Sequence, residues 1–388
     1  MFMHRFILAG SGLAALSLAA CAVWLFLLPP APPVVEAPPV AQSETDAMLA
    51  SLRPRRARRP LIAIVGLNDA TETTDFLMPA GILRRADIAD VVMLAIAPGA
   101  VKLYPALSVE ADATTAQFDE RHPEGADYVI VPAMSRDDDP NVIGWLRSQA
   151  GKGAIVISVC AGAKVVGAAG LLDGKRATTH WYYLKDLLAR NPSIRYAPDR
   201  RMVVDESVAT TTGISASMPM MLTLIEAIAG REKAEATARD IGLSVWSARH
   251  ASDAFKLTRR FATTVLGNAL AFWRRERIGM ELKPGVDEVA LALVADAWSR
   301  TYRSRAVTFA TQPEAVETRN GVRLIPDETA ADRPEGQRVY AFAGQRPAEA
   351  LDRALLAIAT AYGERTAEVV AMQLEYPRPI EPAGGPRL

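Results

Sequence analysis

The chain has 388 residues, half of them hydrophobic, and equal numbers of basic and acidic residues, 44 of each. This composition predicts two domains of ordinary size with a substantial core, and it excludes a globally disordered protein. The zero net charge argues against a dedicated nucleic-acid binder, which usually carries a basic excess. The two cysteines, Cys21 and Cys160, and the four scattered histidines show no metal-ligand spacing, so we expect no metal site and no disulfide within the folded part.

The N-terminal stretch from Phe6 to Leu28 is apolar, and its 23 residues are enough to span a bilayer at about 1.5 Å per residue. Three interpretations are open. A transmembrane anchor over residues 1–30 is favoured, because Ala22 to Leu28 continues the apolar run. The segment Leu18-Ala19-Ala20-Cys21 resembles a bacterial lipobox and suggests a lipoprotein instead. A cleaved signal peptide would have a shorter apolar region and a small-residue cleavage site.

Residues 31–58 are rich in proline and arginine and are expected to form a linker. The arginine-rich run from Arg53 to Arg59 is interpreted either as a solvated linker or as a contact with anionic lipid. Arg5 beside the apolar stretch predicts that the N-terminus stays inside and that the body is periplasmic or otherwise extracytoplasmic. The later arginines oppose this orientation but lie beyond the ~15–20 residues over which the positive-inside rule is strong.

A first domain is predicted over residues 59–230, where apolar strands alternate with helices. This order is typical of a flavodoxin-like three-layer α/β sandwich with a mainly parallel sheet. Strands are expected at residues 61–66, 91–96, 101–109, 128–132, 154–159 and 208–213, and helices at 74–86, 142–150 and 219–229.

The segment from Ala154 to Lys164 predicts a nucleophile elbow, which is a buried strand, a sharp turn and a helix. Cys160 would stand at the turn, where the positive end of the following helix favours a thiolate. In parallel sheets the functional crevice lies at the carboxyl ends of the strands. Residues that follow Val65 and Val131, and His180 further along, should therefore share the rim with Cys160.

Four motifs in this order make the domain resemble the ThiJ/PfpI superfamily, which has a class I glutamine amidotransferase-like fold. The resemblance is closest to the isocyanide hydratases and to the sensor domains of AraC-type regulators. The motifs are Cys160-Ala161-Gly162-Ala163, Ala169-Gly170-Leu171-Leu172-Asp173-Gly174, Ala177-Thr178-Thr179-His180-Trp181 and Thr211-Thr212-Gly213-Ile214-Ser215-Ala216.

The resemblance implies a catalytic role for Cys160, Asp75 and His180, with Asp75 as the acid that contacts the cysteine. It also implies that the backbone amides of Ala161 and Met134 hold developing negative charge. This chain departs from the family at Pro132-Ala133-Met134, where the family usually has Pro-Gly-Gly. The residue after Cys160 is alanine where the protease-like branch has histidine, so we expect no peptidase activity.

Plainer interpretations of these residues remain open. Cys160 would then be a small buried hydrophobe, Asp75 the cap of its helix, and His180 a structural histidine.

Residues 231–388 are predicted to contain a helical connector and a second, degenerate α/β domain. The segment Pro334-Glu335-Gly336 repeats Pro123-Glu124-Gly125 at an offset of 211 residues (334 − 123), and Asp287 opens an apolar helix as Asp75 does. No cysteine occurs in this half. It would therefore be a shortened, catalytically empty copy that packs on the first domain or forms an intrachain pseudo-dimer with it. A conventional dimer is the other arrangement.

Two functions are consistent with these patterns. The first is a membrane-anchored, cysteine-dependent enzyme that acts on a small electrophile, as a hydratase, hydrolase or glyoxalase-like protein, and needs no cofactor. The second is a non-catalytic sensor that binds a ligand or an oxidant through the same site. A DNA-binding regulator is a weaker third, because no AraC-type helix-turn-helix pattern is visible.

Overall fold

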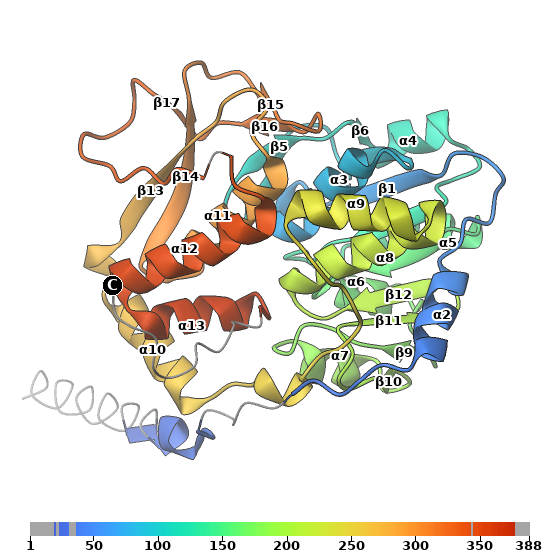
Figure 1. Ribbon diagram of the computed structural model, residues 1–388, viewed down its shortest axis with the longest axis horizontal. Helices are drawn as coiled ribbons and strands as arrows, with labels where there is room; N and C mark the ends of the chain where they lie inside the picture. The colour runs from blue at the N-terminus through green and yellow to red at the C-terminus, as the bar shows by residue number, and fades with distance from the viewer. Residues whose placement is uncertain (1–18, 21–22, 31–35, 343, 377–388) are drawn as a thin grey trace, which may run out of the picture.

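A computed structural model describes residues 19–20, 23–30, 36–342 and 344–376. The first half is built on a seven-stranded sheet in the order β11-β12-β8-β7-β1-β3-β6, in which all neighbours are parallel except β11 and β12 (Figure 1). The strands are β1 (Leu61–Gly66), β3 (Asp90–Ala95), β6 (Ala113–Thr114), β7 (Tyr128–Val131), β8 (Ile155–Ser158), β11 (Met202–Asp205) and β12 (Val208–Thr211). The predicted mainly parallel sheet is thus confirmed.

Helices cover both faces of this sheet, as the predicted three-layer sandwich requires. Alternate residues of β1 point to opposite faces, so that Ile62 and Ile64 join one apolar core while Ala63 and Val65 join the other. The first core is shared with α3 (Thr73–Ala86), α8 (Ser217–Ala229) and α9 (Arg231–Ile241). The second is shared with α4 (Thr115–Arg121), α5 (Pro140–Gly151), α6 (Gly162–Ala168) and α7 (Leu184–Arg190).

One predicted strand is not part of the seven-stranded sheet. The segment expected to be a single edge strand at 101–109 forms β4 (Val101–Tyr104) and β5 (Ser108–Glu110), which pair with each other. They belong to a separate five-stranded sheet, β15-β16-β5-β4-β2, in which β2 is Asp69–Glu72, β15 is Val316–Glu317 and β16 is Arg323–Ile325. The apolar residues of this segment are too few for the pattern to distinguish one strand from a hairpin.

The linker predicted at 31–58 contains a folded element. Helix α2 (Gln42–Ser51) packs on α8 and β11, Leu52 is fully buried, and the Tyr128 hydroxyl donates to the Leu52 carbonyl at 2.7 Å. Arg56 pairs with Asp127 and donates to nearby carbonyls. Neither interpretation of the arginine run, as a solvated linker or as a lipid contact, describes this arginine, because the folded domain binds it.

The second half forms a smaller sheet, β13-β14-β17, flanked by helices. Strands β13 and β14 are parallel and are joined by α11, as β1 and β3 are joined by α3. The remaining elements include the short strands β9 (Arg176–Ala177) and β10 (Arg195–Tyr196) of the first half. Those of the second half are α10 (Arg259–Leu270), β13 (Glu276–Glu281), α11 (Glu288–Ser299), β14 (Ser304–Ala310), β15 (Val316–Glu317), β16 (Arg323–Ile325), β17 (Glu328–Thr329), α12 (Pro347–Tyr362) and α13 (Glu364–Gln373).

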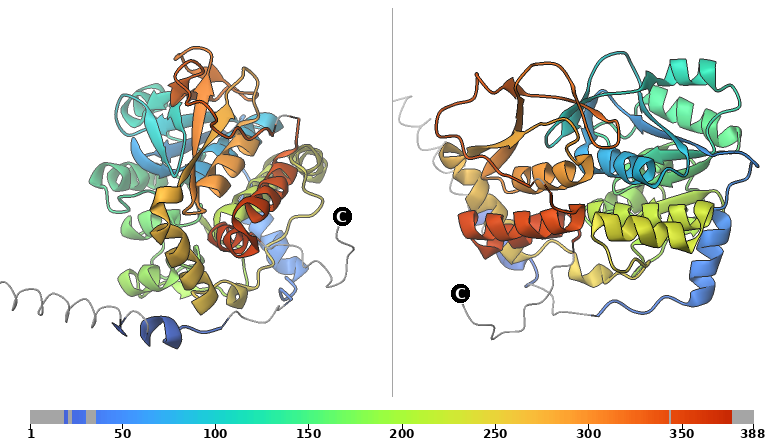
Figure 2. Two further views of the ribbon diagram at one scale, coloured as in Figure 1. Left: turned by 90° about the vertical axis from the view of Figure 1, so that its left-hand side faces the viewer. Right: turned by 45° about the horizontal axis from the view of Figure 1, so that its top comes forward.

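The two halves pack through α3 and α11, which lie side by side (Figure 2). The contacts are reciprocal. Glu72, which caps the start of α3, pairs with Arg300 at the end of α11 at 2.8 Å, and Asp287, which caps the start of α11, pairs with Arg85 near the end of α3 at 2.5 Å. Strand β16 also pairs with β5 in antiparallel register. The second half therefore packs on the first, and its origin as a degenerate repeat stays a prediction.

The predicted transmembrane stretch lies largely outside the described residues. Within the part of the chain that the structure describes, no helix is both long enough and apolar enough to cross a membrane.

Candidate active site

Cys160 occupies the sharp turn between β8 and α6. Its backbone has φ +54°, in the left-handed region that residues with a side chain seldom adopt. Two threonines hold this conformation: the Cys160 N–H donates to the Thr211 hydroxyl at 3.1 Å, and the Thr179 hydroxyl donates to the Cys160 carbonyl at 2.9 Å. This is the geometry of a nucleophile elbow, in which strain is held by the surrounding structure.

A glycine lets the elbow helix approach the neighbouring strand. A Cβ atom on Gly162 would lie 2.1 Å from the Val131 carbonyl oxygen at the end of β7. No side chain fits there, so this glycine fixes the position of α6 and of the turn before it.

Asp75 lies in the first turn of α3 and is fully buried. Its Oδ2 accepts the Ala133 N–H at 3.1 Å, whereas its Oδ1 has no hydrogen-bond partner among the described residues. Glu72 caps the helix, since its carboxylate accepts the Asp75 N–H at 2.6 Å. The interpretation of Asp75 as the helix cap is therefore wrong, and one oxygen of its carboxyl group is left for other chemistry.

The structure adds three residues that the sequence analysis did not identify. Glu72 is paired with Arg300, whose Nε also contacts both oxygens of Asp296 at 2.8 and 2.9 Å. All three side chains are at least 85% buried. One guanidinium from the second half thus pairs with two buried carboxyls, Glu72 and Asp296, and its charge also acts on a third, Asp75. The cap position of Glu72, three residues before Asp75, was a usable local signal, but Arg300 had none.

Burial dominates the protonation of this cluster. It raises the pKa of Asp75 to about 7, against the opposing effects of the Ala133 amide and Arg300. It raises the pKa of Glu72 to about 8, helped by the Asp75 charge and opposed by Arg300. The acids therefore retain protons near neutral pH far more than exposed carboxyls do.

The same environment acts on the cysteine. Burial raises the pKa of the Cys160 thiol well above its usual value, and the charges of Asp75, Glu72 and Glu375 add to this effect. The Ala161 N–H opposes it. The direction of the shift is opposite to the one expected for the elbow, because burial and the charges of three carboxyls raise the pKa of the thiol more than the Ala161 N–H lowers it.

The His180 ring is hydrogen-bonded to the last residue of the C-terminal helix α13. Its Nδ1 accepts the Tyr182 N–H at 3.2 Å, so Nε2 carries the proton and donates to the Gln373 carbonyl at 2.9 Å. Burial also lowers its pKa. Both ring nitrogens are thus engaged away from the cysteine, and the geometry favours the structural interpretation of this residue.

The two amides predicted to bind negative charge differ in their surroundings. Ala161 precedes α6, and its N–H points at the Cys160 sulfur. Met134 is partly buried and lies opposite Thr71 in an isolated antiparallel bridge. The N–H of Ala133, the residue before Met134, donates to the Asp75 carboxylate.

The residues that follow α13 contact the loops around Cys160. The Glu375 carboxylate accepts the N–H groups of Trp181, at 2.7 Å, and of Gly213. The Ser215 hydroxyl donates to the Glu375 carbonyl at 2.7 Å. The second half therefore contacts the cysteine region at two places, through Arg300 and through the segment from Gln373 to Glu375.

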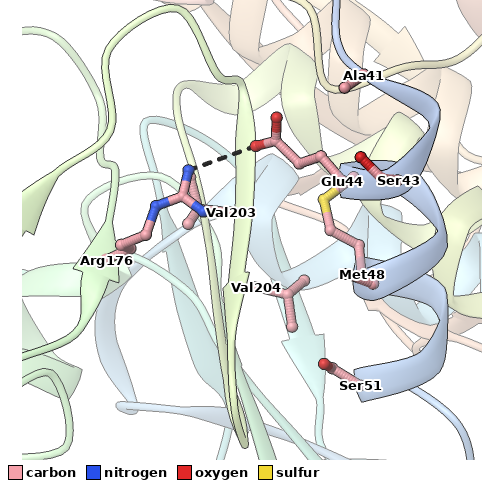
Figure 3. Close-up of a pocket in the computed structure, with 9 residues that line it drawn as sticks. Ala41, Ser43, Glu44, Met48, Ser51, Arg176, Val203 and Val204 are labelled. Carbon is pink, nitrogen blue, oxygen red and sulfur yellow. Dashed lines mark hydrogen bonds and ion pairs between the residues drawn. The ribbon is translucent and has the colours of Figure 1, made fainter.

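Two pockets are lined by residues away from Cys160. One, of about 420 Å³, lies between α2 and β11, where Glu44 pairs with Arg176 (Figure 3). The other, of about 510 Å³, lies beyond β13 and is lined by Lys283, Arg319 and Tyr340 among others. Among the described residues, no group of histidine, cysteine and acidic side chains has the arrangement of a metal site.

Residues 62–227 match the DJ-1/PfpI family. The chain contains a DJ-1/PfpI domain. This agrees with the resemblance drawn from its motifs, and the elbow at Cys160 lies within the matched residues.

Relatives of the domain include both enzymes and regulators. Isonitrile hydratase of Pseudomonas putida is 43% identical over 99 residues, which are 25% of this chain and 42% of that protein. Protein dj-1beta of Drosophila melanogaster is 28% identical over 184 residues, 46% of this chain and 95% of that protein. The HTH-type transcriptional regulator GbdR of Pseudomonas aeruginosa is 34% identical over 90 residues, 23% of this chain and 24% of that protein.

Solved structures resemble about half of the chain. The crystal structure of Drosophila melanogaster DJ-1beta is 24% identical, with a TM-score of 0.44, and covers 48% of this chain and 100% of its own. A ThiJ/PfpI family protein from Pseudomonas syringae is 19% identical, with a TM-score of 0.44, and covers 49% of this chain and 77% of its own.

Proposed function

We propose that the chain is a membrane-anchored, cysteine-dependent enzyme that adds water to, or hydrolyses, a small electrophilic substrate. The observation that carries the proposal is the strained elbow at Cys160, on whose thiol the charge of Asp75 acts. Asp75 is a buried carboxyl, and one of its oxygens has no hydrogen-bond partner among the described residues. The similarity to isonitrile hydratase supports a substrate with an electrophilic carbon bonded to nitrogen.

The raised pKa of the thiol determines how such an enzyme would work. Cys160 is a thiol at rest, so its proton must leave as the sulfur attacks carbon. Asp75, whose pKa lies near neutrality, accepts that proton on its carboxylate and then gives it to the substrate. Water next adds to the same carbon and the carbon–sulfur bond breaks; one proton of the water ends on the substrate nitrogen and the other returns to the sulfur. The net change is the addition of one water molecule, and neither a metal nor a redox cofactor takes part.

The test is turnover of alkyl isonitriles by the full chain, with formamide formation followed by NMR and 2-oxoaldehydes as a second substrate class. Cys160→Ser should lower turnover at least ~10³-fold while circular dichroism is unchanged, because the hydroxyl is a far weaker nucleophile. Cys21→Ser is the matched control and should retain activity. Equal turnover by Cys160→Ser and the parent chain would contradict the proposal.

A second candidate is a sensor that binds a small ligand or an oxidant at the same elbow. The observation that favours it is the burial of Cys160, which raises the pKa of its thiol, and the similarity to GbdR supports it. Ligand binding or peroxide oxidation at Cys160, measured by mass spectrometry, without turnover of either substrate class would favour the sensor.

We also propose that the apolar stretch from Phe6 to Leu28 anchors the protein in a membrane, with its body on the extracytoplasmic side. The supporting feature is the length and apolarity of the stretch. Flotation of the full chain with vesicles tests the anchor, and protease protection in intact cells tests the side.

A further inference from the structure

An exposed apolar surface lies at the end of α10. Leu266, Leu270, Phe272 and Trp273 are 39, 59, 65 and 70% exposed, and the last two rings pack edge to face at 5.2 Å. These four side chains fall within eight consecutive residues. A cluster of large apolar groups of this kind usually marks a surface that contacts something else.

The surface has a basic border. Arg274 and Arg275 follow the two aromatic residues directly, are exposed, and form no ion pair within the described part of the chain. Exposed aromatic rings next to unpaired arginines are typical of surfaces that rest at the boundary between acyl chains and anionic headgroups. A surface that contacts only water is not stabilised by exposing aromatic rings beside unpaired arginines.

The same helix holds the end of the apolar N-terminal stretch. Arg259, the first residue of α10, donates to the carbonyls of Leu25 and Leu28 at 3.2 and 3.4 Å, and its guanidinium lies over the Phe26 ring at 4.8 Å from the centroid. Its N–H donates to the Pro29 carbonyl at 2.9 Å. Figure 1 shows this segment, in dark blue, beside α10 and far from the seven-stranded sheet.

We propose that Leu266, Leu270, Phe272 and Trp273, with Arg274 and Arg275, form a docking surface for an anionic lipid bilayer. This inference rests on the membrane anchor of the proposed function. Residues that α10 binds, 25–29, end the stretch assigned to the bilayer, and α10 extends only about 18 Å from there at 1.5 Å per residue. The surface would add a second point of contact between the body and the membrane and so fix the orientation of the body.

The experiment uses the full chain in vesicles that contain brominated phosphatidylcholine and ~30% phosphatidylglycerol. We expect bilayer bromine to quench Trp273, so Trp273→Phe should remove a quenched component from the tryptophan emission. Trp145→Phe is the matched control, since Trp145 lies on α5 and is buried against Phe118 of α4, and it should leave the quenched component unchanged. Arg274→Gln with Arg275→Gln, or vesicles without anionic lipid, should lower Trp273 quenching at least ~threefold.

Three outcomes would overturn the proposal, and they are distinguishable. A chain that floats with vesicles while Trp273 is not quenched retains its anchor but has no docking surface. A chain that does not float has lost both the anchor and this inference. A dimer of the detergent-solubilised chain that Phe272→Ser converts to a monomer would assign the surface to a second copy instead.

Discussion

At the residue scale, Cys160 is surrounded by more acid than base. Glu72 and Asp296 both pair with the guanidinium of Arg300, and the charge of Arg300 also acts on Asp75. The three carboxyls are buried, and the Arg300 side chain is 15% exposed. One cation cannot hold three carboxylates ionised in a low-dielectric setting, so protons remain in the cluster. The site is thus organised to move a proton near neutral pH, which fits a thiol that must lose one as it reacts.

Asp75→Asn should reveal two effects of this carboxyl: the effect of its charge on the pKa of the thiol, and its role as the proton acceptor. Removing its charge lowers the pKa of Cys160, so the pH midpoint of iodoacetamide alkylation should fall. Loss of the proton acceptor should at the same time lower turnover by about 10²–10⁴-fold. Alkylation is followed in a Cys21→Ser background, with the exposed Asp138→Asn as the control. A midpoint equal to that of the control would mean that the Asp75 charge does not act on the thiol.

Motif order identified Cys160 and Asp75 because both belong to local patterns, a strand–turn–helix and a helix start. Arg300 could not be found in this way, since it reaches Glu72 from 228 residues further along the chain. For His180, the local pattern was visible in the sequence but its bonding partner was not. Its spacing predicted a return to the rim, but the hydrogen bond of its Nε2 to Gln373 depends on a distant helix, which local spacing does not reveal.

At the scale of elements, the elbow depends on how closely α6 approaches β7. The apolar runs of β1, β3, β7, β8 and β12 were predicted within two residues of their observed bounds, because buried parallel strands are continuous in sequence. The short strand β11 and the β4–β5 hairpin were missed or misplaced. Their few residues carry little periodicity, and tertiary pairing defines them.

Gly162→Ala and Gly144→Ala form a matched pair of helix substitutions. A Cβ on Gly162 would clash with the Val131 carbonyl, whereas one on Gly144 would meet open space. Gly162→Ala should therefore destabilise the protein by about 1–3 kcal/mol, and Gly144→Ala should stabilise it by up to ~1 kcal/mol. Urea denaturation measures both. Equal midpoints for the two variants would show that the close approach of α6 to β7 is wrong.

At the scale of the whole molecule, one apolar core runs through both halves. It includes Leu52 and Ile62 from the first half and Leu293 and Leu374 from the second. Composition correctly indicated a large core, and the pattern near Asp287 correctly placed the start of α11. How the halves meet could not be predicted, because the contact depends on α3 and α11 presenting complementary ends, a property of two distant segments taken together.

The buried carboxyls predict how the stability of the folded chain depends on pH. The pKa values of Asp75, Glu72 and Asp296 are raised to about 7, 8 and 7, whereas in the unfolded chain such groups titrate near 4. Between those pH values the folded state binds more protons than the unfolded state. The free energy of unfolding should therefore fall as pH rises from about 4.5 to 8, and this contribution is fully present only below about pH 4.

Glu72→Gln tests this directly, because glutamine retains the cap oxygen but does not titrate. The slope of unfolding free energy against pH, from urea titrations between pH 5 and 8, should be shallower than in the parent chain. Glu124→Gln, at an exposed position, serves as the control. A parent slope that rises over this range, or no difference between Glu72→Gln and the control, would contradict the assignment.

The contact between Glu72 and Arg300 has a consequence for how the protein responds to dilution. Both residues belong to one polypeptide, so the guanidinium reaches the acid cluster at a high effective concentration that does not depend on the abundance of the protein. An arginine supplied by a separate subunit would leave as the subunits dissociated at low copy number. The acid–base setting of Cys160 is therefore as complete in a single molecule as in a concentrated solution.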